Sequence, residues 1–371
     1  MQTEHTSCWK NFSGKTLIVP KAEEVSEDLV NRVNAESVSD TNSPARPPRK
    51  RKNEHLYSHL LQGKLDHLKP EERRYLEPVL MKYAHVFHDE CTNDFKGTKV
   101  TEHQILVGDA TPIRKSPYRT PFALRQEMQN QVDQMLKKGI IRPSTSPWSA
   151  PSLLVPKRSP DGKPKYRFCV DFRALNAVTR FDPYPLPIME ETTSALFGSK
   201  YFSVLDCYSG FWQVEIKEEH KELTGFSVPS GHYEFNRLPF GLSNSPANFQ
   251  RMMDTVLRVL LGTECSVYVD DIVIYSSSES EHAKRLENVL QRFDRANLQL
   301  QPGKCVCAQP QLQYLGFVLY KDGIPVKHFK WEGENVIHVF ELEFDEEHNG
   351  EIHFQISLFL KKLQAFTGVN K

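Results

Sequence analysis

The chain has 371 residues, equal numbers of basic and acidic side chains (47 each) and a hydrophobic share of 39%. This length predicts two or three compact units. No apolar run reaches the about 18 residues of a membrane span, and Met1 is not followed by a signal peptide. The seven cysteines lack paired CxxC spacing, so neither a disulfide framework nor a zinc module is indicated. We expect an intracellular protein, cytoplasmic or nuclear, that is neither secreted nor membrane-bound.

The zero net charge hides an uneven distribution of charge along the chain. Residues 110–180 hold 14 basic and 4 acidic residues, a local net charge of +10, whereas residues 331–351 are acidic. A basic stretch of this kind suits the phosphate backbone of nucleic acid. Residues 46–52 form a shorter basic cluster, which resembles a nuclear-import or polyanion-binding patch but is more often a solvated linker.

The N-terminal third mixes a segment without periodicity and two helical patterns. Residues 1–60 predict a flexible leader. Residues 61–100 predict a helical segment, in which Pro70 suits a first helical turn. A second amphipathic helix is predicted over residues 121–138, and Gly139 ends it.

Short β-like runs separated by turns follow Gly139. The runs 152–155 and 166–170 flank a Ser-Pro-Asp-Gly turn and predict a β-hairpin. Further predicted strands cover residues 201–206, 213–216, 265–269, 272–275 and 314–318, and predicted helices cover residues 246–261 and 279–296. This interleaving predicts an α+β fold in which helices cover one face of a sheet.

The sharpest chemical feature is the adjacent pair Asp270 and Asp271, placed at the tip of a hairpin between two apolar strands. Adjacent carboxylates repel each other and are costly to desolvate, so a divalent cation is their natural partner, although a hydrated turn is the simpler alternative. Asp206 ends another apolar strand. If that strand lies beside the hairpin, Asp206 and Asp270 should face each other and hold two Mg²⁺ ions about 4 Å apart, as in-line phosphoryl transfer requires.

A longer series of motifs runs from about His103 to Pro325. It comprises YRFCVDFRALN at 166–176, YPLP at 184–187, LD at 205–206 with SGF at 209–211, LPFGLSNSPANFQ at 238–250, YVDD at 268–271 and YLG at 314–316. In these motifs and their order the chain resembles the reverse transcriptases of Gypsy-type long-terminal-repeat retrotransposons. The resemblance implies the fingers and palm of a right-hand polymerase over residues 101–326, with a ferredoxin-like palm sheet.

The resemblance also assigns roles to the carboxylates. It implies that Asp206, Asp270 and Asp271 form a catalytic triad for two Mg²⁺ ions, which Mn²⁺ can replace, and that the Cys207 carbonyl is a further metal ligand. One ion would lower the pKa of the primer 3′-hydroxyl, and the other would neutralise the triphosphate. Lys304 corresponds to a lysine that protonates the departing pyrophosphate.

Further matching positions concern the incoming nucleotide. Lys157 and Arg167 are implied to contact its β- and γ-phosphates, for which the arginine fork is suited, although solvated surface charge is the alternative. Phe211 is implied to exclude ribonucleotides by packing against C2′ of the sugar, with a core aromatic as the alternative, and the preceding glycine suggests close approach of a ligand. Phe240 and Gly241 are implied to support the base and the template.

The resemblance weakens towards the C-terminus. Leu315, Gly316 and Phe317 correspond to a primer grip. After Pro325 the pattern is lost, so residues 327–371 predict a divergent, partial thumb or connection segment. The chain is therefore expected to be a truncated fragment of a Pol polyprotein with an incomplete thumb.

The predicted function is that of an RNA-directed DNA polymerase, a nucleotidyltransferase that extends a primer on an RNA or DNA template with deoxynucleoside triphosphates. The alternative is a catalytically inert remnant that at most binds nucleic acid, and metal-dependent primer extension separates the two. An RNA-directed RNA polymerase shares the paired aspartates, but the bulky Phe211 argues against it.

Overall fold

The computed structural model describes residues 9–10, 16–17, 49–91, 95–157, 164–188, 192, 195–196, 198–314, 317–320 and 326–327. The chain forms two units, residues 1–45 and 46–371. The described part of the first is an antiparallel pair of short strands, β1 (Trp9–Lys10) and β2 (Thr16–Leu17). Every element below belongs to the second unit.

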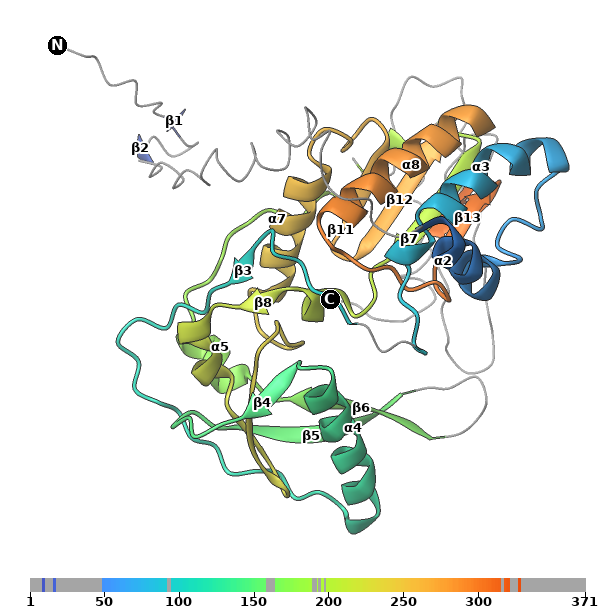
Figure 1. Cartoon of the computed structure of the whole chain (residues 1–371). Helices are drawn as coiled ribbons and strands as arrows, with labels where there is room; N and C mark the ends of the chain where they lie inside the picture. The colour runs from blue at the N-terminus through green and yellow to red at the C-terminus, as the bar shows by residue number, and fades with distance from the viewer. Residues whose placement is uncertain are drawn as a thin grey trace, which may run out of the picture. The chain divides into compact units, whose positions relative to one another are not determined.

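A four-stranded antiparallel sheet, in the order β11-β12-β7-β13, forms the palm (Figure 1). Its elements follow one another along the chain as β7 (Tyr201–Asp206), α7 (Ser245–Leu257), β11 (Cys265–Tyr268), β12 (Asp271–Ser276), α8 (Glu279–Arg295) and β13 (Val306–Gln309). This succession of strand, helix, two strands, helix and strand is the ferredoxin-like arrangement. The predicted palm sheet is confirmed.

Both palm helices pack on one face of the sheet, as predicted. α8 contacts β7 and β12, and α7 contacts β11. Successive residues of a strand point to opposite faces of the sheet. Ser203 on β7 forms a hydrogen bond with His282 of α8, so the Ser203 side chain lies on the face that the helices cover. Phe202, by contrast, belongs to a separate apolar cluster with Val273. Asp206 shares the face of Phe202, so it lies on the side of the sheet away from α7 and α8.

The fingers are built on a five-stranded sheet in the order β4-β10-β9-β5-β6 (Figure 1). Its strands are β4 (Ile141–Pro143), β5 (Ala150–Lys157), β6 (Lys165–Val170), β9 (Phe226–Val228) and β10 (Gly231–Phe235). The β5–β6 pair is the predicted hairpin. β9 and β10 were not predicted, and β9 pairs with β5 in parallel. Helix α4 (Arg125–Lys137) contacts β4 and β6 and covers this sheet.

The helices before the fingers begin inside the segment predicted as a leader. They are α2 (Arg49–Leu56), a π-helical turn η1 (Tyr57–Leu61), α3 (Pro70–Lys82) and a 3₁₀ turn η2 (Ala84–Val86). Tyr57 and Leu61 are buried, and α3 packs against α8 of the palm. A short helix that is stabilised mainly by tertiary contacts shows little helical periodicity of apolar residues in its sequence. Residues 49–60 were therefore predicted to belong to the flexible leader.

Two predicted strands differ from the structure. Residues 213–216 divide into the end of a 3₁₀ turn, η4 (Gly210–Gln213), and a two-residue strand, β8 (Glu215–Ile216), which pairs in parallel with β3 (Glu102–His103). Residues 314–318 are not one strand: Tyr314 ends β14 (Gln311–Tyr314), and Phe317 begins β15 (Phe317–Tyr320). β15 pairs antiparallel with β14 and with β16 (Val326–Lys327). The expected thumb segment after residue 327 lies outside the described residues.

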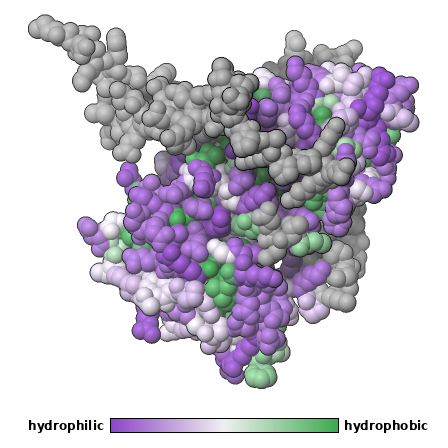
Figure 2. All heavy atoms as spheres, viewed as in Figure 1, coloured by the Kyte–Doolittle hydropathy of each residue, from purple (hydrophilic) through white to green (hydrophobic). Residues whose placement is uncertain are grey.

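The remaining short elements are η3 (Phe122–Leu124), α5 (Arg173–Val178) and η5 (Glu218–Thr224). Among the described helices, none combines the length and the apolar character needed to cross a bilayer. On the face shown in Figure 2, hydrophilic side chains predominate and apolar ones gather only in small patches.

Candidate active site

Three aspartates meet at one end of the palm sheet. The register of β7 and β12 places Asp206 directly opposite Asp271, and opposed residues of neighbouring strands share one face. The sequence predicted Asp270 as the residue facing Asp206. Asp270 lies in the two-residue turn between Tyr268 and Asp271, where its charge adds to burial in raising the pKa of Asp206. Asp271, the first residue of β12, is the residue paired with Asp206 in the strand register. The predicted proximity of β7 and the hairpin is confirmed.

The turn that carries Asp270 has an unusual backbone. Val269 has a φ of +56°, and a branched side chain in this left-handed region is strained. Its N–H donates to Oε1 of Gln250 on α7 at 2.7 Å, and Gln250 Nε2 donates to Asp254 Oδ1 at 2.8 Å. Gln250 is fully buried. Helix α7 therefore holds the turn in a conformation that valine would otherwise avoid.

The carboxylates lie in a partly desolvated place. The Asp206 side chain is 13% exposed, and Lys304 Nζ lies 2.9 Å from its Oδ2. Burial raises the pKa of Asp206 even though the Lys304 ammonium opposes the shift. Burial, followed by the charges of Asp270 and Asp206, also raises the pKa of Asp271. Lys304 thus offsets part of the repulsion, and the cluster retains an excess of negative charge.

A pair of divalent cations fits this cluster by its chemistry. The three carboxylates offer only oxygen ligands, which Mg²⁺ prefers. Burial, followed by the charge of Asp270, raises the pKa of Asp206 and of Asp271, and a bound cation would offset both effects. Cys207 follows directly, with its thiol buried. Burial and then the charges of Asp270 and Asp206 raise the pKa of that thiol well above its usual value, so this residue lies within the field of the cluster.

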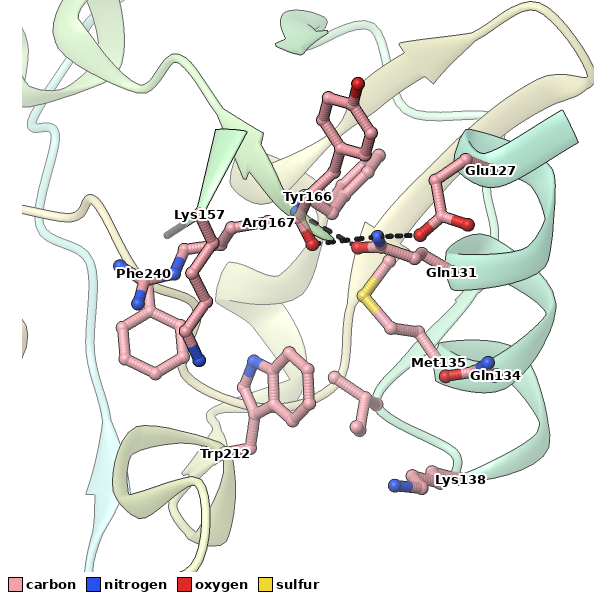
Figure 3. A pocket seen from close by; sticks show the side chains of 12 residues that line it. Glu127, Gln131, Gln134, Met135, Lys138, Lys157, Tyr166, Arg167, Trp212 and Phe240 are labelled. Carbon is pink, nitrogen blue, oxygen red and sulfur yellow. Dashed lines mark hydrogen bonds between the residues drawn. The ribbon is translucent and has the colours of Figure 1, made fainter. Parts of the chain in front are cut away.

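A cavity of about 410 Å³ between α4 and the fingers hairpin brings together Lys157, Arg167 and Phe240. Lys157 and Arg167 lie on one face of the hairpin, because Arg167 is paired with Val155 and side chains alternate along β5. Figure 3 shows both cationic side chains extending towards Phe240 and away from α4. Both cations are exposed. The cavity therefore presents two positive charges and an aromatic ring to a ligand.

Phe211 packs against Phe240, which lines this cavity. It lies in η4, five residues after Asp206. Its ring centroid is 5.2 Å from that of Phe240 and 5.5 Å from that of Phe249. The ring is half-buried, so it packs in the core on one side and reaches the surface on the other. Gly210 also has a packing role, because an added Cβ there would lie 3.0 Å from the Phe249 ring.

Gly241 has a φ of +98°, a conformation that glycine adopts without strain. Asn176 of α5 donates to its carbonyl at 2.9 Å and accepts the N–H of Ser243 at 3.0 Å, which fixes the turn after Phe240. Of the predicted primer grip, Leu315 and Gly316 lie outside the described residues. Phe317 begins β15 and pairs with Tyr314.

Several residues near the site were not predicted from the sequence. Gln131 of α4 donates to the Tyr166 carbonyl at 3.1 Å and accepts the Phe168 N–H at 3.0 Å, which fixes α4 against β6 beside the cavity. Trp212 and Lys138 also line the cavity. Gln250 is the last residue of the motif at 238–250, but no role was predicted for it. A polar residue in the apolar stripe of a predicted helix is the signal that marks it for a hydrogen-bonding role.

Comparison with known proteins agrees with this geometry. The family model described as reverse transcriptase (RNA-dependent DNA polymerase) matches residues 155–319. The chain is 40% identical over 271 residues to the Retrovirus-related Pol polyprotein from transposon 297 of Drosophila melanogaster, covering 72% of this chain and 25% of that protein. It is 42% identical over 217 residues to the polyprotein from transposon gypsy, covering 58% of this chain and 21% of that protein.

The chain thus spans about a quarter of the length of these relatives. Among solved structures, the foamy viral protease-reverse transcriptase in complex with an RNA/DNA hybrid matches with a TM-score of 0.62 and 26% identity, over 76% of this chain and 37% of that one. The chain therefore contains a domain of the reverse transcriptase family, of the type found in the Pol polyproteins of gypsy-like retrotransposons.

Proposed function

We propose that this chain is an RNA-directed DNA polymerase that adds deoxynucleotides to a primer 3′-hydroxyl. The observation that carries the proposal is the pairing of Asp206 with Asp271 across two palm strands, with Asp270 in the adjoining turn. Three carboxylates held in this way by a rigid sheet suit phosphoryl transfer, in which catalysis consists of positioning and of stabilising negative charge.

Asp206, Asp270 and Asp271 would hold two Mg²⁺ ions, with the Cys207 carbonyl as a further ligand and Mn²⁺ as a substitute. When bound, such ions activate the primer hydroxyl and neutralise the triphosphate. The protein's own contribution is to keep the carboxylates ionised and in place: Lys304 lies 2.9 Å from Asp206, and Gln250 holds the turn at Val269. From this position Lys304 also has the charge to protonate a departing pyrophosphate.

The incoming deoxynucleoside triphosphate is proposed to lie between the carboxylates and the cavity of the fingers. Arg167 and Lys157 would bind its β- and γ-phosphates, since a guanidinium forms paired hydrogen bonds to phosphate. Phe211 would face the sugar and exclude a 2′-hydroxyl. Phe240 is 51% exposed and would support the base or the template together with Gly241.

A template paired with a primer is the proposed macromolecular partner. Residues 110–180 carry the basic excess noted above, and several of its cations, including Lys157 and Arg167, lie on the fingers beside the cavity. The related foamy viral enzyme is described in complex with an RNA/DNA hybrid and with double-stranded DNA. The described cysteines are all free, which suits the reducing cytoplasm or nucleus as the proposed location.

Primer extension on poly(rA)/oligo(dT) with Mg²⁺ or Mn²⁺ tests the proposal. The purified chain should extend the primer, Asp270→Asn should abolish extension, and Asp109→Asn, a change of the same kind at an exposed position, should leave it intact. A folded chain that binds the substrate but does not extend it in either metal would contradict the proposal and favour an inert remnant.

A further inference from the structure

A second group of metal-binding side chains lies far from the carboxylate cluster in sequence. His59, Asp89 and Cys91 each offer one ligand atom, and these atoms all lie within 4.8 Å of one another. His59 Nε2 is 3.8 Å from Asp89 Oδ1 and 3.9 Å from Cys91 Sγ. The group joins an imidazole, a carboxylate and a thiol, so it is not a cluster of like charges.

The fold, rather than local spacing, brings these residues together. His59 lies in the π-helical turn η1, which is anchored by the buried side chains of Tyr57 and Leu61. Asp89 and Cys91 follow a segment tied to the palm, where the His88 N–H donates to the Leu300 carbonyl at 2.8 Å. The Cys91 N–H donates to Asp89 Oδ1 at 3.0 Å. Contacts with the rest of the fold thus hold η1 and the backbone at His88, and π-helical turns recur at functional sites.

The separations between the ligand atoms are close to those around a tetrahedral zinc ion. With Zn–N and Zn–O bonds of about 2.0–2.1 Å and a Zn–S bond of about 2.3 Å, two ligand atoms on one ion lie about 3.3–3.6 Å apart. The two separations that involve His59, 3.8 and 3.9 Å, exceed this by only a few tenths of an ångström, and the ligand atoms of Asp89 and Cys91 lie within 4.8 Å of each other. Binding of an ion would draw the three ligand atoms closer together by side-chain rotation.

We propose that His59, Asp89 and Cys91 form a zinc site that fastens the N-terminal helices to the palm. Nitrogen, oxygen and sulfur ligands together select a borderline-soft ion such as Zn²⁺ over Mg²⁺, so this site is chemically distinct from the aspartate cluster. The His59 side chain is 49% exposed and the Asp89 side chain 11% exposed, which leaves an entry path for the ion and room for water as a fourth ligand.

The position of the site gives the ion a structural role. The His88 ring, next to Asp89, stacks on Tyr208 with centroids 3.7 Å apart, and Tyr208 lies two residues after Asp206. An ion that joins η1 to this segment would therefore hold the N-terminal helices against the part of the palm that carries the first catalytic aspartate. Because the ion binds only the folded arrangement, it should stabilise that arrangement.

Cobalt substitution in the full-length chain tests the proposal, because a thiolate bound to Co²⁺ gives a charge-transfer band that Mg²⁺ sites lack. We expect one Co²⁺ per chain with this band, displaced by Zn²⁺, and a rise in Tm on adding Zn²⁺. Cys91→Ser should abolish the band and the rise in Tm, and should weaken Zn²⁺ binding by more than about 100-fold, beyond the loss of an outer-shell partner.

Cys169→Ser is the matched control, because Cys169 is a half-buried thiol on β6, and it should behave as wild type. His59→Gln provides a second variant should Cys91→Ser fold poorly, and it should also lose Zn²⁺ affinity. A cobalt spectrum without the thiolate band, or one that persists in Cys91→Ser, would overturn the proposal.

Discussion

Replacing Gln250 with leucine removes the side chain that holds the turn carrying Asp270. Gln250 accepts the Val269 N–H at 2.7 Å, and Val269 has a φ of +56°. The left-handed conformation costs a non-glycine residue about 1–2 kcal/mol. A buried N–H left without an acceptor costs a further 1–3 kcal/mol, roughly. Without Gln250, the turn should therefore leave its present conformation in most molecules.

The magnitude follows from the population of the competent turn. Each 1.4 kcal/mol lowers it about tenfold, so the two costs together, about 2–5 kcal/mol, should lower the rate of single-nucleotide incorporation about 30- to 4,000-fold in Gln250→Leu. The affinity for template–primer should stay unchanged, because the Gln250 side chain is fully buried and does not reach the surface. Single-turnover incorporation and a separate binding titration measure the two quantities.

Two further variants make this prediction specific. Gln129→Leu is the matched control: Gln129 bonds only to Asp133 on the exposed side of α4, at 2.7 Å, and its loss should not change the rate. Val269→Gly in the Gln250→Leu background should recover part of the rate, because glycine tolerates a positive φ. A folded Gln250→Leu chain that incorporates nucleotides at the wild-type rate would refute the reasoning.

Three other outcomes are expected. His282 is fully buried between Ser203 and Ser276, and burial lowers its pKa from 6.5 to about 3. As the pH falls, the unfolded chain therefore binds this proton before the folded chain does, and the free energy of unfolding should decrease below about pH 6.5, by about 2 kcal/mol at pH 5. Urea unfolding should show a smaller pH dependence of this free energy in His282→Gln than in the wild type. An equal pH dependence in the two chains would contradict this. Arg167→Ala should raise the KM for deoxynucleotides about 10- to 100-fold, because a charge-assisted hydrogen bond contributes roughly 1.5–3 kcal/mol. Arg167→Lys should raise this KM less, and equal KM values of the two variants in steady-state kinetics would contradict the proposed role of Arg167. Phe211→Val should increase ribonucleotide incorporation relative to deoxynucleotide incorporation by about 10- to 100-fold, and an unchanged ratio in a competition assay would show that Phe211 is only a core aromatic.

Five of the six palm elements could be predicted from sequence, whereas β13 (Val306–Gln309) was not predicted. The predicted palm strands are continuous apolar runs buried by helices, and α8 is an amphipathic helix that begins at a capping serine, Ser278, which accepts the Glu281 N–H. The predicted strand 201–206 and helix 279–296 differ from the structure by at most one residue. In these elements the local sequence pattern and the tertiary packing favour the same secondary structure.

Other features depend on contacts that no local pattern reports. The parallel pairing of β5 with β9 joins residues about 75 positions apart, and the three-residue β9 is too short to show a periodicity. The pairing of Asp206 with Asp271 leaves Asp270 in a two-residue turn without glycine, and the Val269 N–H of this turn bonds to Gln250, which is 19 positions away in the chain. The group of His59, Asp89 and Cys91 likewise exists only in the folded chain.

The central claim is that Asp206, Asp270 and Asp271 hold the catalytic cations. The most direct test is to count Mn²⁺ ions by electron paramagnetic resonance on the chain saturated with a dideoxy-terminated template–primer and the next nucleotide. A Cys91→Ser background removes the other candidate cation site. We predict two bound Mn²⁺ ions per chain, and fewer in the same chain carrying Asp270→Asn. Equal Mn²⁺ binding with and without Asp270→Asn would contradict the account.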